Sequence, residues 1–237
     1  MRSLFGGASR ESAKPGPEYP KVAFAEPLPY GYLYAGLEID PPGRAPFVRR
    51  SARREEALEE CKAVAGRLEA LGGVVRATVY RAVLIPPIVG APRFDAVVLV
   101  QTDSPEAIAG VRSSEAFGRL GADFVMGARN ARRIGDTEET LSGTFLFNHF
   151  AAEDPEGAVQ AWEDLTGWYT AKTGVDNSAL LRPIGDAPYA FVNYVRLPRG
   201  PGRFMLDQLV RPSFHTFVRA KLRANGMVAM PLLCEPV

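Results

Sequence analysis

Residues 143–174, GTFLFNHFAAEDPEGAVQAWEDLTGWYTAKTG, begin a pattern that the chain has already completed once. An apolar run leads into Asp154-Pro155-Glu156, where Asp suits the N-cap and Pro the first turn of a helix. Apolar side chains then recur at helical spacing, at Val159, Trp162, Leu165 and Tyr169. Gly174 can end the helix as a C-terminal cap. The stretch therefore predicts a strand over 143–151 followed by a helix.

The rest of the chain shows the same order of elements twice. The second copy continues with strands over 178–184 and 188–197, a helix over 204–224 interrupted near Pro212, and a strand over 226–233. The first copy consists of a strand over 30–39, a helix over 53–71, strands over 74–85 and 94–101, a helix over 104–120 that is broken near Ser113, and a strand over 124–134. Each copy reads β-α-β-β-α-β.

This repeated order predicts an α+β fold made of two fused ferredoxin-like repeats, over residues 29–136 and 143–237. A single unit of this kind has helices on one face of its sheet and leaves the other face apolar. We expect the two sheets to pack face to face as a dimeric α+β barrel within one polypeptide.

The composition excludes several classes of function. Among 237 residues the formal net charge is +1, which provides no general field for attracting nucleic acid or acidic membranes. The two cysteines, Cys61 and Cys234, do not form a disulfide framework or a zinc site, and we expect both to be buried and reduced. Residues 1–28 are expected to form a flexible N-terminal tail without a secretory signal, in a cytoplasmic protein.

The stretch from about Tyr30 to Val237 resembles the tandem form of the dimeric α/β-barrel proteins, a group that includes the antibiotic-biosynthesis monooxygenases. Residues 143–150, GTFLFNHF, and 188–195, PYAFVNYV, carry the resemblance best. Within that group the chain is most similar to oxygenases that open or contract an angucycline ring in aromatic polyketide pathways.

The resemblance implies an oxygenase that acts on a polycyclic phenol or hydroquinone, by hydroxylation or carbon–carbon ring cleavage, with dioxygen and without a tightly bound metal. A base would deprotonate the phenol, and the anion would pass an electron to dioxygen. Reduced flavin, FADH2 or FMNH2, is implied as a diffusible cosubstrate, with a flavin reductase as a partner. The partners expected are thus a small aromatic substrate and no nucleic acid or membrane, while a homodimer remains open.

The candidate base is one of the two histidines, because imidazole transfers protons near neutral pH. His215 lies on the last predicted helix, at the margin of an apolar stripe that includes Phe214. His149 lies on the first strand of the second repeat, and as a strand residue it can equally be a hydrogen-bonded structural side chain. The sequence leaves open which of them is the base.

The remaining candidates also lie in the second repeat. Asn148 resembles the pocket Asn of the monooxygenases, and Asn193 and Tyr194 lie on a neighbouring strand, so all three are expected to orient substrate oxygen atoms. Both tryptophans of the chain, Trp162 and Trp168, fall on the helix that follows. Trp162 fits a core position, and Trp168 is the better candidate for a lid over a flat ligand. Together with Phe214 they are expected to bind the substrate, in a cavity between the sheet and the helices of this repeat.

Two alternatives stay open. A heme-binding barrel with a His ligand is one, although the heme-degrading relatives carry a Trp on the strand where this chain has Asn193 and Tyr194. A non-catalytic binder or a polyketide cyclase is the other. Dinucleotide, Walker and G-x-S-x-G motifs are absent from the sequence. The basic residues Arg44, Arg49, Arg50, Arg53 and Arg54 are expected to be a solvated flank of the first helix.

Overall fold

The computed structural model describes residues 19–43 and 45–237. Its strands are β1 Gly31–Leu37, β2 Val74–Leu84, β3 Ala96–Thr102, β4 Phe124–Ile134, β5 Phe145–Ala151, β6 Ser178–Pro183, β7 Phe191–Arg196 and β8 Val228–Pro236. Its helices are α1 Ala52–Glu69, the 3-10 turn η1 Pro105–Ala107, α2 Ile108–Arg112, α3 Glu115–Gly118, α4 Pro155–Thr173, α5 Pro201–Leu209, the π-helical turn η2 Phe214–Val218 and α6 Arg219–Ala224. The predicted order of elements is confirmed.

Local signals explain where these helices begin and end. The Asp154 carboxylate accepts hydrogen bonds from the amides of Glu156 and Gly157, both at 3.1 Å, and so caps α4. Gly174 ends α4 with φ 74°, a conformation that glycine adopts without steric cost. The predicted interruptions are also present, because Ser113 separates α2 from α3 and Pro212 lies between α5 and η2.

The eight strands form one closed antiparallel barrel with the order β1-β3-β2-β8-β5-β7-β6-β4. Within it both halves have the same internal order, β4-β1-β3-β2 in the first and β8-β5-β7-β6 in the second. Two antiparallel strand pairs, β2 with β8 and β4 with β6, join the first half to the second edge to edge. The predicted α+β barrel is therefore present, and its closure joins the strand edges of the two halves and leaves none of the eight strands with an unpaired edge.

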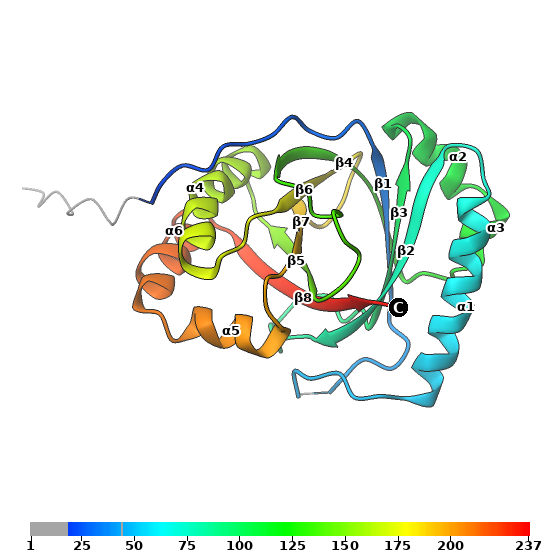
Figure 1. Ribbon diagram of the computed structural model, residues 1–237, viewed down its shortest axis with the longest axis horizontal. Helices are drawn as coiled ribbons and strands as arrows, with labels where there is room; N and C mark the ends of the chain where they lie inside the picture. Colours follow the sequence, from blue (N-terminus) through cyan, green and yellow to red (C-terminus); the bar gives the residue numbers. More distant parts are fainter. Residues whose placement is uncertain (1–18, 44) are drawn as a thin grey trace, which may run out of the picture.

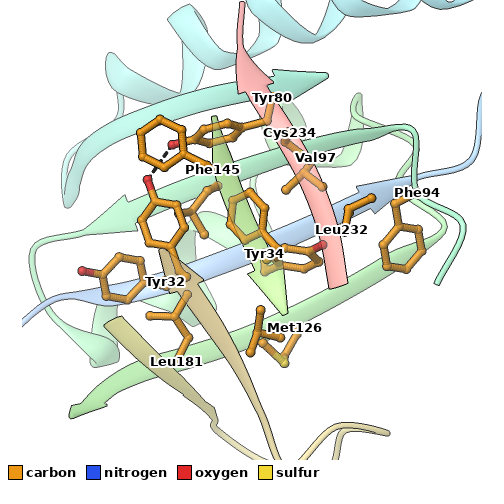
Figure 2. Packing of buried hydrophobic residues seen from close by; sticks show 14 of the residues in the cluster. Tyr32, Tyr34, Tyr80, Phe94, Val97, Met126, Phe145, Leu181, Leu232 and Cys234 are labelled. Atoms are coloured by element: carbon orange, nitrogen blue, oxygen red, sulfur yellow. Dashed lines mark hydrogen bonds between the residues drawn. The ribbon is translucent and has the colours of Figure 1, made fainter. Parts of the chain in front are cut away.

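Aromatic side chains fill the interior of the barrel. Tyr34, Tyr80 and Phe145 are fully buried there, and Figure 2 shows them in one cluster that also includes Leu181 and Leu232. The hydroxyls of Tyr80 and Tyr194 hydrogen-bond across the halves at 2.6 Å. The barrel lumen is therefore a packed aromatic core.

The helices cover the outside of the barrel in two groups. Figure 1 shows α1, α2 and α3 beside the strands of the first half, and α4, α5 and α6 beside those of the second. Cys61 and Cys234 are buried and free, as predicted. Among the described residues, no helix has the length and apolar character needed to cross a membrane.

Part of the predicted N-terminal tail is packed on the molecule. Its residues 1–18 lie outside the described residues, but residues 19–28 run along the second half (Figure 1). Ala25 forms a bridge with Arg133 of β4, and the Leu28 amide donates to the side-chain oxygen of Asn130 at 3.0 Å. For residues 19–28 the expectation of a flexible tail is thus corrected.

Candidate functional site

A cavity lies between the outer face of the second-half sheet and its helices, where the sequence predicted it. The sheet contributes Asn148 from β5 and Asn193 from β7, and α4 covers them with Trp162 and Tyr169. The volume of the cavity is about 50 Å³. The lining residues are Ile134, Leu146, Asn148, Phe150, Trp162, Leu165, Thr166, Tyr169, Thr170, Val175, Ser178, Asn193, Val195, Phe204, Val218, Leu222 and Ala229.

The lining is apolar and aromatic, and none of these described residues is charged, a histidine or a cysteine. A wider groove of about 550 Å³ runs along α1 and β2 in the first half, but it is open to solvent and bordered by Lys62, Glu69 and Arg76. We take the second-half cavity as the candidate site, because binding sites for small molecules are concave, mostly apolar and furnished with a few polar groups.

The polar groups of the cavity sit on the sheet. Asn148 and Asn193 face each other across β5 and β7 as direct cross-strand partners. The Ser178 hydroxyl donates to the side-chain oxygen of Asn193 at 2.5 Å, so that amide is held in place. The side-chain oxygen of Asn148 is buried and has no partner among the described residues. An unpaired buried acceptor costs about 1–3 kcal/mol, which a ligand hydroxyl would recover.

Tyr169 is a cavity residue that sequence reasoning did not select as a site residue. It lies on α4, and its ring packs edge-on against Trp168 with centroids 5.0 Å apart. Burial raises the pKa of the Tyr169 hydroxyl, so this group stays protonated and can donate a hydrogen bond. The signal was present in the sequence, because Tyr169 shares the helical stripe of Trp162 and Leu165.

His149 does not reach the cavity. Its side chain points into the barrel, where one ring nitrogen lies 3.0 Å from the Tyr34 hydroxyl and the other 3.2 Å from the carbonyl oxygen of Met230. Burial lowers the pKa of His149 to about 4, although the hydrogen bond to Met230 opposes this shift. The residue is thus a neutral structural histidine near pH 7, and its place as a candidate base in the cavity is corrected.

His215 also lies away from the cavity lining. It is exposed on η2, and its Nε2 donates to the carbonyl oxygen of Leu209 at 2.8 Å. The neighbouring Phe214 packs against Trp168, with ring centroids 5.7 Å apart, outside the lining. On η2 the side chains of Phe214, Phe217 and Val218 pack toward α4, and Val218 also lines the cavity, while His215 faces solvent.

Of the other predicted residues, Trp162 lines the cavity, while Trp168 and Tyr194 do not. Trp168 of α4 is fully buried, and its indole N–H donates to the Ser213 hydroxyl at 3.0 Å. It is therefore not a lid over the cavity. Tyr194 follows Asn193 on β7, and the alternation of the strand turns its ring into the barrel. The structure thus brings together Asn148, Asn193 and Trp162 from the predicted set.

The implied cofactors can be compared with this lining. Flavin nucleotides carry phosphate, and no Lys or Arg is present among the described lining residues to bind it. Heme needs an axial ligand, and the lining holds no His, Cys or Met, with Tyr169 as its one phenol. No group of three or more His, Cys, Asp or Glu residues in the described part of the chain could hold a metal ion. Flavin does not fit this lining, and Tyr169 is the one possible ligand for heme iron among the described lining residues.

The basic run before α1 has a structural role in part. Arg54 is buried and its Nε donates to the carboxylate of Asp95 at 2.7 Å, whereas Arg50 is exposed beside Glu55. Arg44 lies outside the described residues. The expectation of a solvated flank is therefore wrong for Arg54.

Comparisons with known proteins place the fold. No protein-family model matches the chain, and no curated protein matches its sequence. Among solved structures, an anthrone oxidase-like protein is similar with a TM-score of 0.58 and 13% sequence identity, covering 90% of this chain and 93% of that one. A candidate monooxygenase from Fusobacterium nucleatum is similar with a TM-score of 0.51 and 7% identity, covering 90% and 94%. At these identities the likeness shows a shared fold.

Proposed function

We propose that the chain is an oxygenase that binds a neutral polycyclic phenol in the second-half cavity and oxidises it with dioxygen. The observation that carries this proposal is the uncharged aromatic lining with the unpaired side-chain oxygen of Asn148 on its floor. Aromatic walls favour a flat apolar ligand, and the unpaired amide favours one that bears a hydroxyl. The names of the two solved structures with the same fold add an oxidase or monooxygenase activity as the reaction class.

The chemistry needs no electron source other than the substrate. The phenol gives one electron and one proton to dioxygen, which leaves an aryloxyl radical and a hydroperoxyl radical. These recombine at a ring carbon to form a hydroperoxide. If that carbon carries a hydrogen, loss of water leaves a carbonyl, so one dioxygen molecule yields a quinone-type product and water.

The protein contributes position and polarity in this scheme. The amide oxygen of Asn148 would accept a hydrogen bond from the phenolic hydroxyl and so make the ring more electron-rich. Tyr169 would donate to the oxygen that gains negative charge. Since no ionisable base lies among the described lining residues, the phenolic proton would leave with the reduced dioxygen. This replaces the base-catalysed step that the sequence suggested.

The finer assignments are also proposals. Residues 29–136 and 143–237 would be two ferredoxin-like repeats, which the identical strand order of the halves supports. The resemblance of residues 143–150 and 188–195 supports an aromatic polyketide, such as an angucycline intermediate, as the substrate, with hydroxylation or ring cleavage as the outcome. Because flavin does not fit the cavity, we propose that the reaction proceeds without it.

Dioxygen uptake with anthrone, a neutral polycycle that enolises to a phenol, tests the function. We expect uptake without added flavin or metal, one water formed per dioxygen consumed, and a rate that is flat between about pH 6 and pH 8 because no lining residue titrates there. Asn148→Leu should lower the rate at least about tenfold, whereas Thr170→Val at the cavity rim should not. Anthrone binding without dioxygen uptake would instead support the non-catalytic binder.

A further inference from the structure

Residues 19–28 cross the outside of the second half and contact three elements that form the cavity. The Tyr19 ring packs on Phe217 of η2 with centroids 4.8 Å apart, and the Lys172 ammonium of α4 lies 5.8 Å above the same ring. The Phe24 ring lies 5.9 Å from that of Trp162 on α4. We call residues 19–28 the strap.

Three contacts of the strap lie at, or next to, a residue that lines the cavity. Phe24 packs on Trp162, which itself lines the cavity, and Tyr19 packs on Phe217, which precedes the lining residue Val218. Ala25 pairs with Arg133, which precedes the lining residue Ile134. The strap therefore packs against the outer side of the cavity wall.

Gly167 makes the close approach of the strap possible. A Cβ atom at this position would lie 2.3 Å from the carbonyl oxygen of Pro20, a separation that no side chain tolerates. Gly167 follows the lining residue Thr166 in the middle of α4, where glycine weakens a helix by about 1 kcal/mol relative to alanine. The helix thus carries a costly residue at the point where the strap crosses it.

The cavity as described is too small for the ligand that its lining suits. Its volume of about 50 Å³ is well below the roughly 300–1,000 Å³ of ordinary ligand pockets. The floor belongs to a closed barrel, which cannot widen without breaking strand pairs. The outer wall is different, because α5, η2 and α6 are short pieces and η2 is a π-helical turn. Opening is therefore easiest at the seam between α4 and η2, where Tyr19 sits.

We propose that the strap is a gate: it holds the cavity closed, and a ligand enters between α4 and η2 when Tyr19 leaves Phe217. The proposal uses the cavity of the proposed function but not its chemistry. It predicts that weakening the strap speeds ligand entry without removing any group that touches the ligand.

Stopped-flow binding of Nile red, a neutral polycyclic dye, tests the gate on the full chain. In Tyr19→Ala we expect the association rate constant to rise about tenfold, with affinity unchanged or tighter because the open state is more populated. Phe24→Ala should act in the same direction and serves if Tyr19→Ala fails to fold. Phe47→Ala, which removes an exposed aromatic ring outside the strap, should leave the rate unchanged. An unchanged rate in both strap variants would overturn the proposal.

A second measurement separates failure of the gate from failure of the site. Ala229→Leu fills the cavity and should abolish dye binding, and binding that survives would show that the dye sits elsewhere and would count against the proposed function. Amide hydrogen exchange needs no ligand. Exchange in Phe214–Val218 and in the second half of α4 should be faster in Tyr19→Ala than in the wild-type protein or Phe47→Ala. Equal exchange rates there would refute the gate whatever the dye does.

Discussion

The two halves of the molecule have the same strand order, but the faces of their sheets that lie under the helices differ. In the first half the face under α1 is a filled core, in which Ala35 of β1 lies opposite Val98 of β3. In the second half the face under α4 holds a cavity, in which Asn148 lies opposite Asn193. These pairs occupy equivalent positions. The Asp95 amide donates to the carbonyl of Leu37 just as the Ala190 amide donates to that of Phe150.

The comparison shows that the fold does not require the two asparagines. In the first half, the aliphatic side chains of Ala35 and Val98 fill the equivalent position. Burying an unpaired amide lowers stability. The equivalence extends to the strand ends, where the first half has the buried pair of Arg54 with Asp95, and Ala190 stands at the position of Asp95. The first half therefore carries the features of a scaffold, and the second half carries those of a site.

The largest effect is expected from the buried ion pair of the scaffold. Asp95 is fully buried, and its carboxylate accepts from Arg54 and from the amides of Ile39 and Asp40. Asp95→Ala leaves Arg54 buried without its partner, which should lower the free energy of unfolding by about 3–5 kcal/mol in urea denaturation. Asp207→Ala, which breaks an exposed pair with Arg199, is the control and should cost less than about 1 kcal/mol. Equal losses of unfolding free energy in the two variants would show that burial does not determine how much an ion pair contributes to stability.

The next effect should appear on acidification. Burial lowers the pKa of His149 to about 4 from the usual 6.5, so the unfolded chain takes up a proton before the folded one does. Stability is therefore complete above pH 6.5 and falls by about 3 kcal/mol as the pH drops through 4. In His149→Gln the difference in unfolding free energy between pH 7 and pH 4 should shrink by about that amount. The same slope in both proteins would contradict the assignment.

One substitution in each half tests the comparison directly. Val98→Asn puts an amide into the filled core of the first half and should cost about 2–3 kcal/mol. Asn148→Leu removes the unpaired amide of the second half and should leave stability unchanged or raise it by about 1 kcal/mol, while ligand affinity falls. Denaturation and Nile red titration of both variants measure this. A destabilising Asn148→Leu would indicate a structural asparagine.

The smallest effect is expected at the exposed histidine. His215→Ala loses one hydrogen bond, to the Leu209 carbonyl, and should cost less than about 1 kcal/mol. Dioxygen uptake should be unchanged, because His215 does not line the cavity. A selective loss of turnover at normal thermal stability would restore His215 as the base and count against the uncharged site.

Elements set by local signals could be predicted closely. The strand Phe124–Ile134 has the predicted bounds, and α4 lies between its two capping residues, Asp154 and Gly174. Asn148 and Asn193 could be placed together because the repeat order makes their strands neighbours. Trp168 was placed wrongly and Tyr169 overlooked for one reason: successive helical residues are turned by about 100°, so only one of two neighbours can face the sheet.

The amino-acid sequence alone determines the order of elements, their caps and breaks, and the concentration of unusual side chains in the second half, because these depend on neighbours along the chain. The tertiary structure decides which side of each strand is the barrel interior, and so sends His149 inward while Asn148 faces the helices. It also decides that the halves join by their edges, that η2 turns His215 to solvent, and that the strap lies on α4. Each of these depends on contacts between residues far apart in the chain, whose energies no local pattern of side chains encodes.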